Sequence, residues 1–162
     1  MIIRKARIKD IDNVVKLGER FINDHNDLVF SINPIFEELV EKKDDAKDVF
    51  KQFVRNKIYA NNAAVYVAED KGKLVAYSLI YIKKNNPTHK IEKVGYFSDL
   101  FVKKEYRGKK IASRFKELAL KFFKDKGVNY ASIACNPHNE LAKKIYRNWG
   151  FIDYSYILWK KI

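Results

Sequence analysis

The chain contains little cysteine, proline or glycine: one, three and six residues among 162. A single cysteine, Cys135, excludes an intramolecular disulfide framework and a zinc site built from several thiolates. The three histidines, His25, His89 and His138, lack the spacing of metal ligands, so we expect no metal. Neither of the common glycine-rich phosphate loops, GxxxxGK(S/T) and GxGxxG, is present.

Long apolar runs are absent as well. No stretch approaches the roughly 20 apolar residues that span a membrane, and the apolar part of residues 1–5 is too short for a signal peptide. We therefore expect a soluble, cytoplasmic protein. Hydrophobic residues make up 47% of the chain and aromatic residues 14%, which is enough for one core. A single domain over residues 1–162 is predicted.

Charge is distributed unevenly within a net charge of +13. Residues 1–70 contain 12 Lys/Arg and 13 Asp/Glu, whereas residues 71–162 contain 21 and 7. The basic half would attract polyanions, either nucleic acid or a nucleotide cofactor with several phosphates. Within residues 24–48 acidic side chains outnumber basic ones. That stretch is either a solvated helix face or a surface for a cationic partner.

Alternating and helical hydrophobic patterns predict a mixed α/β domain in the order β-α-α-β-β-β-α-β-α-β. Strands are expected over residues 2–8, 64–69, 73–82, 91–102, 130–135 and 151–159. Helices are expected over residues 10–23, 35–60, 111–126 and 139–148, with a loop over 24–35. Asp44-Asp45 is a candidate interruption of the second helix, and Gly95 or Ser98 a candidate bulge in the long strand.

The most informative segment is the basic turn between the strand ending at Val102 and the helix that starts at Ile111. Backbone N–H groups at a helix start have no intrahelical partner and can hold phosphate. Arg107 and the neighbouring lysines add formal positive charge, and Gly108 lets a phosphate approach the backbone. The turn therefore predicts a pyrophosphate site at a strand-to-helix corner; the alternative is an ordinary basic helix start.

This segment resembles the acyl-CoA-binding motif of the GNAT superfamily of N-acetyltransferases. Matching positions are Val102, Tyr106, Arg107, Gly108, Ile111 and Ala112. Lys110 departs from the motif, because the family most often has a second glycine there. The resemblance covers essentially the whole chain and implies a twisted, mostly antiparallel sheet of about 6–7 strands with about four flanking helices. It also implies acetyl-CoA as co-substrate. The implied cofactor-binding residues are Leu100, Phe101, Val102, Arg107, Gly108, Lys109, Lys110, Ile111, Ala112, Ser113, Asn136 and Asn139.

A second motif, Asn136-x-x-Asn139-x-x-Ala142-x-x-x-Tyr146, is similar to the C-terminal GNAT signature. The resemblance implies that both asparagines contact the cofactor and that Tyr146 is the general acid. A phenol with an ordinary pKa near ~10 is protonated at neutral pH and can donate to a departing thiolate. The alternative is that Tyr146 is a core aromatic and the asparagines cap the helix.

Asp99 lies in the strand whose free edge, at Leu100 to Val102, is implied to pair with the acyl-pantetheine arm. One backbone N–H there would polarise the thioester carbonyl. Asp99 is a candidate base for the incoming amine; it can equally hold an ammonium group or be structural. Cys135 is a candidate nucleophile only by position, and a lone strand cysteine is more typically a small apolar residue.

These features together predict an acetyl-CoA-dependent N-acyltransferase, in which a primary amine attacks the thioester directly in a ternary complex. Two alternatives are a non-catalytic acyl-CoA-binding regulator of the same fold and a basic nucleic-acid-associated protein. The latter is less favoured because no nucleic-acid motif is present. The acceptor is a small-molecule or peptide amine, and the acidic stretch favours a cationic one. A homodimer is compatible with the resemblance, and no membrane partner is expected.

Overall fold

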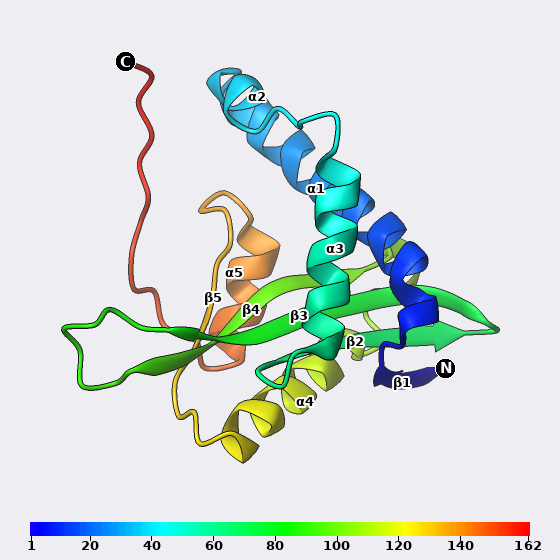
Figure 1. The fold of residues 1–162 in the computed structure, drawn as a ribbon. Helices are drawn as coiled ribbons and strands as arrows, with labels where there is room; N and C mark the ends of the chain where they lie inside the picture. Colours follow the sequence, from blue (N-terminus) through cyan, green and yellow to red (C-terminus); the bar gives the residue numbers. More distant parts are fainter.

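A five-stranded sheet forms the centre of the computed structural model, which describes residues 1–162 (Figure 1). The strands, in both chain order and sheet order, are β1 (Ile2–Lys5), β2 (Ala63–Asp70), β3 (Lys73–Lys84), β4 (Lys93–Val102) and β5 (Ala131–Ile133). β1 to β4 pair antiparallel, and β5 joins β4 in parallel. The predicted mixed, mostly antiparallel α/β fold is confirmed, with fewer strands than the six or seven expected.

Five α-helices and two short 3-10 turns surround this sheet. The helices are α1 (Ile11–Ile32), α2 (Ile35–Leu39), α3 (Ala46–Tyr59), α4 (Ile111–Asp125) and α5 (Glu140–Asn148), and the turns are Ile8–Asp10 and Lys104–Tyr106. α1 and α3 pack together on one face of the sheet, and α4 packs on the other (Figure 1). None of the helices combines the length and apolar character that a membrane span requires.

The two faces of the sheet bury two separate hydrophobic clusters. Val14, Val67 and Tyr77 belong to the cluster beneath α1 and α3, whereas Phe97 and Phe115 belong to the cluster beneath α4. Alternate residues of a strand point to opposite faces, so each central strand supplies both clusters. β2 and β3 are accordingly buried over most of their lengths.

Several predicted boundaries were wrong. The expected first strand over 2–8 ends at Lys5, and Ile8–Asp10 form a 3-10 turn. The expected loop over 24–35 is helical to Ile32, because no proline or glycine interrupts this stretch before Pro34 and Val29 is buried. The expected helix over 35–60 consists of α2 and α3, and the break at 40–45 contains the predicted Asp44-Asp45 interruption. The expected closing strand over 151–159 is absent, and these residues have no regular secondary structure.

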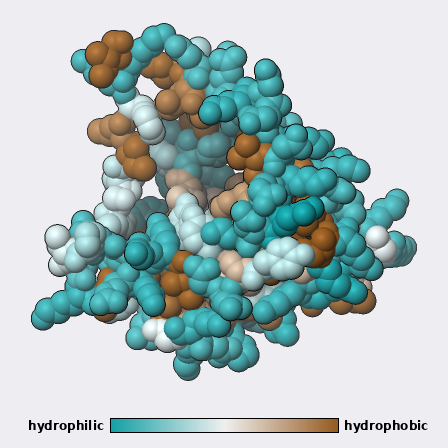
Figure 2. Space-filling model, viewed as in Figure 1, coloured by the Kyte–Doolittle hydropathy of each residue, from teal (hydrophilic) through white to brown (hydrophobic).

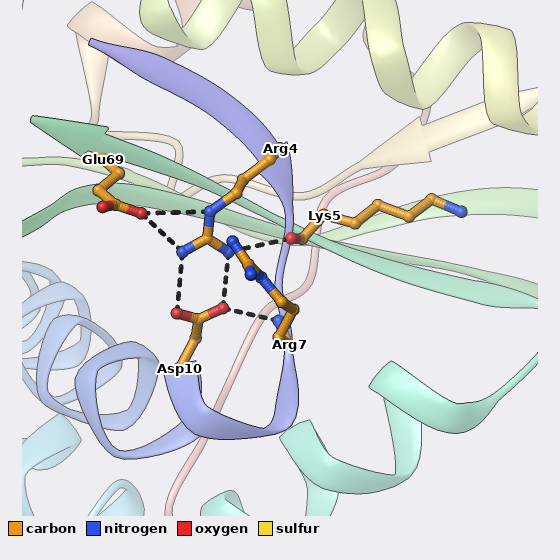
Figure 3. Close-up of polar contacts among 5 residues, drawn as sticks. All are labelled: Arg4, Lys5, Arg7, Asp10 and Glu69. Carbon is orange, nitrogen blue, oxygen red and sulfur yellow. Dashed lines mark hydrogen bonds and ion pairs between the residues drawn. The ribbon is translucent and has the colours of Figure 1, made fainter. Parts of the chain in front are cut away.

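A polar network ties β1 to the start of α1 (Figure 3). The guanidinium of Arg4 donates to both carboxylate oxygens of Asp10, at 2.7 and 3.0 Å, and also to Glu69 on β2. The backbone N–H of Arg7 donates to Asp10 at 2.7 Å. Asp10 is buried, and its partners hold the pKa of its carboxyl below the ordinary value, with the Arg4 hydrogen bond as the main cause. This network fixes the angle at which α1 leaves the sheet.

Candidate active site

A β-bulge in β4 decides which way Asp99 points. Leu79 of β3 pairs with Asp99 and the next residue, Ile80, pairs with Phe97, so Ser98 is the extra residue. Without this insertion Asp99 would face α4 together with Phe97. With it, Asp99 lies on the α1 face, on the same side as Phe101. The bulge expected at Gly95 or Ser98 is therefore at Ser98.

Asp99 accepts two hydrogen bonds there. The phenol of Tyr77 donates to Oδ2 at 2.8 Å, and the hydroxyl of Ser98 donates to Oδ1 at 2.8 Å. Burial raises the pKa of Asp99 and outweighs both hydrogen bonds, which lower it. Burial likewise raises the pKa of Tyr77, so this phenol remains a donor throughout the physiological range. The arrangement suits a carboxylate that accepts a proton from an amine.

Aromatic side chains on the same face line the sheet beyond Asp99. The rings of Tyr81 and Tyr96 lie 5.3 Å apart, and Phe53 of α3 packs against Tyr81. The ammonium of Lys57 lies 3.8 Å from the centroid of the Tyr81 ring. Burial lowers the pKa of Lys57. The ammonium of Lys83 lies 4.1 Å from the centroid of the Tyr96 ring, so each of the two rings is already covered by a lysine of this chain.

β4 and β5 separate immediately beside Asp99. Their pairing is limited to Gly95–Phe97 against Ala131–Ile133, so Leu100, Phe101 and Val102 pair with β3 only. For this reason the observed strand β5, Ala131–Ile133, is shorter than the predicted strand over 130–135. The second edge of β4 is free over these residues, as the sequence-based interpretation requires. An extended ligand can add its hydrogen bonds at such an edge.

The basic turn that follows β4 exposes a run of unpaired donors. The backbone N–H groups of residues 108–113 donate to no backbone or side-chain acceptor. They lie at and just before the N-terminus of α4, where the helix dipole adds positive potential. Gly108 and Lys110 both adopt left-handed backbone conformations, with φ of 77° and 59°. Lys110 thus occupies a glycine-like conformation at the position where the motif usually has glycine.

The side chains of this turn form their own contacts. Arg107 donates from Nε to the carbonyl of Val102 at 3.1 Å and forms an ion pair with Asp24 of α1 at 3.2 Å. Lys109 and Lys110 are exposed, and Lys109 lies over the ring of Tyr106, 4.7 Å from its centroid. Ala112 and Ser113 lie in the first turn of α4. The predicted turn residues are therefore together at one corner.

Helix α5 carries the second motif. Asn139 caps the helix by accepting from the N–H of Ala142 at 3.0 Å, and Asn136 accepts from the N–H of His138 at 2.8 Å. Their amide NH₂ groups remain available as donors. Tyr146 packs against Trp149 and Phe151, and burial raises its pKa to about 12. Tyr146 is therefore a protonated phenol, as a hydrogen-bond donor must be.

Cys135 follows β5 and is exposed. Partial burial of its sulfur raises the pKa of the thiol, with smaller effects from nearby charges. A nucleophilic cysteine needs the opposite, a lowered pKa. The thiol therefore lacks the activation that covalent acyl transfer would need.

Sequence reasoning missed two side-chain contacts of this site, Tyr77 with Asp99 and Asp24 with Arg107. Tyr77 lies 22 positions before Asp99, and Asp24 lies 83 positions before Arg107, so no local spacing connects the partners. The alternation of β3 does place Tyr77 on the α1 face, which was the available signal. The acidic side chains of residues 24–48 are exposed on the end of α1, on α2, on the connection to α3 and in the first turn of α3.

Comparison with known proteins gave one family and several structural relatives. The model of the acetyltransferase (GNAT) family matches residues 27–151. No curated protein matches the chain significantly. A predicted acetyltransferase from Clostridium acetobutylicum, crystallised with acetyl-CoA, has 21% identity and a TM-score of 0.78, covering 99% of this chain and 95% of that one.

Two further relatives have the same fold. A tetramutant of the BH1408 protein from Bacillus halodurans has 23% identity and a TM-score of 0.75, with 100% of both chains covered. An aminoglycoside 6'-N-acetyltransferase from Acinetobacter haemolyticus has 14% identity and a TM-score of 0.74, covering 100% of this chain and 99% of that one. At these identities the similarity shows a common fold.

Proposed function

The chain belongs to the GNAT acetyltransferase family, and from this premise we propose that it transfers an acetyl group from acetyl-CoA to a primary amine by direct attack. The observation that carries the proposal is the run of unpaired N–H groups over residues 108–113, beside a strand edge that is free from Leu100 to Val102. The first feature suits a pyrophosphate and the second suits the extended pantetheine arm.

The residues of the turn fit this substrate. The turn combines six unpaired backbone donors with the positively charged side chains of Arg107, Lys109 and Lys110, and two linked phosphates require donors and positive charge of this kind. Asn136 and Asn139 would offer their NH₂ groups to the amides of the arm. A free N–H of the β4 edge would polarise the thioester carbonyl.

Asp99 is the proposed base. The incoming amine must lose a proton as its nitrogen forms a bond to the acetyl carbon and the carbon–sulfur bond breaks. Asp99 accepts that proton directly or through water, and Tyr77 and Ser98 hold the carboxylate in place. Much of the acceleration comes from holding the amine and the thioester together.

Tyr146 is the proposed acid on the thiolate side. A phenol whose pKa is about 12 is a weaker acid than a thiol, whose pKa is near ~8.5. Full proton transfer to the thiolate is therefore uphill, and the phenol acts by donating a hydrogen bond as negative charge develops on sulfur. The proton that ends on the CoA thiol is therefore the one that the amine releases.

The acceptor is proposed to be a cationic small-molecule amine. Exposed acidic side chains lie at the end of α1, on α2, in the connection to α3 and in the first turn of α3. They favour a substrate with several ammonium groups. Relatives of the same fold include aminoglycoside 6'-N-acetyltransferases, which makes amino sugars the first compounds to test.

Thiol release from acetyl-CoA tests the proposal. The purified protein is incubated with acetyl-CoA and a panel of aminoglycosides, polyamines and peptides, and free thiol and acceptor mass are followed together. We expect amine-dependent thiol release with addition of one acetyl group to the acceptor. CoA binding without release for any amine would favour the non-catalytic regulator instead, and absence of CoA binding would overturn both.

A further inference from the structure

A cavity of about 320 Å³ opens between the outer strand β1 and the C-terminal half of α4. α4 packs mainly against β2, β3 and β4, so β1 is left partly uncovered on this side of the sheet (Figure 1). At ~30 Å³ for each water in the liquid, the space equals roughly ten waters, and it lies within the ~300–1,000 Å³ of ligand pockets. The residues that line the cavity are Ile3, Arg4, Lys5, Tyr66, Leu118, Lys121, Phe122 and Asp125.

The base of the cavity is apolar. Leu118 and Phe122 lie one turn apart on α4, and Ile3 faces them from β1. All three pack against the hydrophobic cluster beneath α4, yet each stays only partly buried. An apolar ring that covered them would complete their burial. A flat ring suits Phe122 in particular, because aromatic rings attract one another in offset and edge-to-face arrangements.

The phenol of Tyr66 has no partner within the protein. The phenols of Tyr77 and Tyr106 donate to carboxylates, whereas that of Tyr66 forms no hydrogen bond although the residue is only 5% exposed. Ser78 Oγ is the one fully enclosed polar side-chain atom without a partner, so the Tyr66 hydroxyl reaches solvent through the cavity that Tyr66 lines. Burial and, second, the charge of Asp125 raise the pKa of Tyr66, so this phenol is a protonated donor. A ligand in the cavity can satisfy it.

Lys5 brings an ammonium group to the same place. It lies directly opposite Tyr66 in the register of β1 and β2, so both side chains face α4. The side chain of Lys5 runs away from the Arg4 network (Figure 3), and its ammonium lies 6.0 Å from the centroid of the Phe122 ring. A cation and a phenol donor therefore stand together above an apolar base.

The charge of Lys5 is the one that the cavity leaves uncompensated. The guanidinium of Arg4 is held by its own carboxylate partners on the other face of the sheet, and Lys121 is paired with Asp125 at 2.9 Å. Lys5 forms no ion pair with any of these carboxylates. The lining thus carries a net positive charge, which favours an anionic ligand.

We propose that this cavity binds a small aromatic carboxylate. The ring of the ligand packs on Ile3, Leu118 and Phe122. One carboxylate oxygen accepts from the ammonium of Lys5 and the other from the hydroxyl of Tyr66. The site lies on the face of the sheet opposite to Asp99, shares no residue with the acyl-transfer site and does not depend on the proposed function.

The surroundings favour a small molecule over a protein partner. In the view of Figure 2 the surface is mainly hydrophilic, and the hydrophobic side chains form separate patches. A specific protein partner buries ~1,200–2,000 Å² of surface. A ligand of the size of the cavity needs only the three apolar side chains at its base.

Titration with indole-3-acetate, followed by ¹H–¹⁵N NMR of the labelled protein, is the first test. Indole-3-acetamide has the same shape without the charge, and acetate has the charge without the ring. We expect the amide signals of Lys5, Tyr66 and Phe122 to shift and saturate with a Kd on the order of 0.1–1 mM, with or without saturating CoA. The acetamide and acetate should bind roughly tenfold more weakly or worse. Equal binding of the acetamide, displacement by CoA, or no saturable shift with about 10 mM probe would overturn the proposal.

Two variants test the assigned contacts. Lys5→Met should raise the Kd for indole-3-acetate roughly tenfold, and Tyr66→Phe should raise it a few-fold, since each removes one donor to the carboxylate. Lys116→Met removes the same charge from α4 outside the cavity, where Lys116 lies over Trp149, and should bind as the wild type does. The ¹H–¹⁵N spectrum of each variant reports its folding, so lost binding is distinguished from lost structure. An unchanged Kd in folded Lys5→Met or Tyr66→Phe would contradict the assigned contacts.

Discussion

The phenol of Tyr77 donates a 2.8 Å hydrogen bond to Oδ2 of Asp99, which joins the middle of β3 to the bulge of β4 beneath α1. Burial raises the pKa of this carboxyl, whereas the bonds from Ser98 and Tyr77 lower it. Removing the Tyr77 bond must therefore raise the pKa of Asp99 further. The proposed role of Asp99 as a base can therefore be tested by measuring how its pKa changes when Tyr77 is substituted.

The pH dependence of turnover should move when Tyr77 is changed. A base works only when ionised, so kcat/KM rises with pH through the pKa of Asp99. In Tyr77→Phe this rise of kcat/KM, the acid limb of the pH profile, should shift to higher pH. In Asp99→Asn kcat/KM should fall by roughly 10²-fold or more, and the acid limb should be lost. Tyr66→Phe, a buried tyrosine of the α4-side cluster, is the control. A lower rate in Tyr77→Phe with an unmoved limb would leave Tyr77 with a packing role only.

Tyr146→Phe should lower kcat by roughly 10-fold to 10²-fold while the Kd for CoA changes little, because the hydrogen bond strengthens only as charge develops on sulfur. Single-turnover kinetics and direct CoA titration give the two quantities separately. Tyr130→Phe changes an exposed tyrosine and provides the baseline. An unchanged kcat in Tyr146→Phe would remove this residue from the mechanism.

Two lysines with positive φ make a matched pair for the CoA turn. Lys110 has φ of 59° and Lys71, in the β2–β3 turn, has φ of 48°. Replacing either by glycine should relieve about 1 kcal/mol of left-handed strain and raise Tm by about 2–4 °C. Only Lys110→Gly should weaken CoA binding, by a few-fold that diminishes with salt, since one cation leaves the turn. Tighter binding would instead mark the Lys110 side chain as an obstruction.

Asp24 competes with a phosphate for the guanidinium of Arg107, because the two side chains form an ion pair at 3.2 Å. Asp24→Asn should therefore tighten CoA binding by a few-fold, as measured by calorimetry at low and moderate salt. Asp27→Asn, on the same helix and without an ion pair to Arg107, should not. Equal affinities in all three proteins would show that Arg107 is not a phosphate ligand.

The network around Arg4 should dominate acid stability at the β1–α1 junction. Arg4→Met leaves the buried carboxylate of Asp10 without its main partner and should lower the free energy of unfolding by about 3 kcal/mol in urea titrations near neutral pH. Because the pKa of Asp10 is lowered in the folded state, its contribution is present above its unfolded pKa and disappears as the pH falls through the folded value. The wild type and Arg4→Met should therefore converge in stability at low pH. A constant difference across the acid range would contradict this origin.

Features that depend on residues adjacent in the chain were predicted better than contacts between residues far apart in sequence. The turn at residues 107–110 and the start of α4 follow from residues adjacent in the chain, and the bulge near Ser98 was among the expected irregularities. The contacts of Tyr77 with Asp99 and of Asp24 with Arg107 were missed because the partners are far apart in sequence. The strand expected over 151–159 is absent because a strand needs a partner, and local composition does not specify whether one is present in the same chain.

The claim at the centre of this account is that the backbone N–H groups of residues 108–113 hold the pyrophosphate of CoA. Amide ¹H–¹⁵N NMR of the labelled protein during titration with CoA tests it directly, since each of these donors has its own signal. The account predicts that the signals of residues 108–113 shift together and saturate with the Kd measured by calorimetry, while the signals at the start of α3 stay in place. Saturable CoA binding that leaves the amides of residues 108–113 unmoved would contradict it.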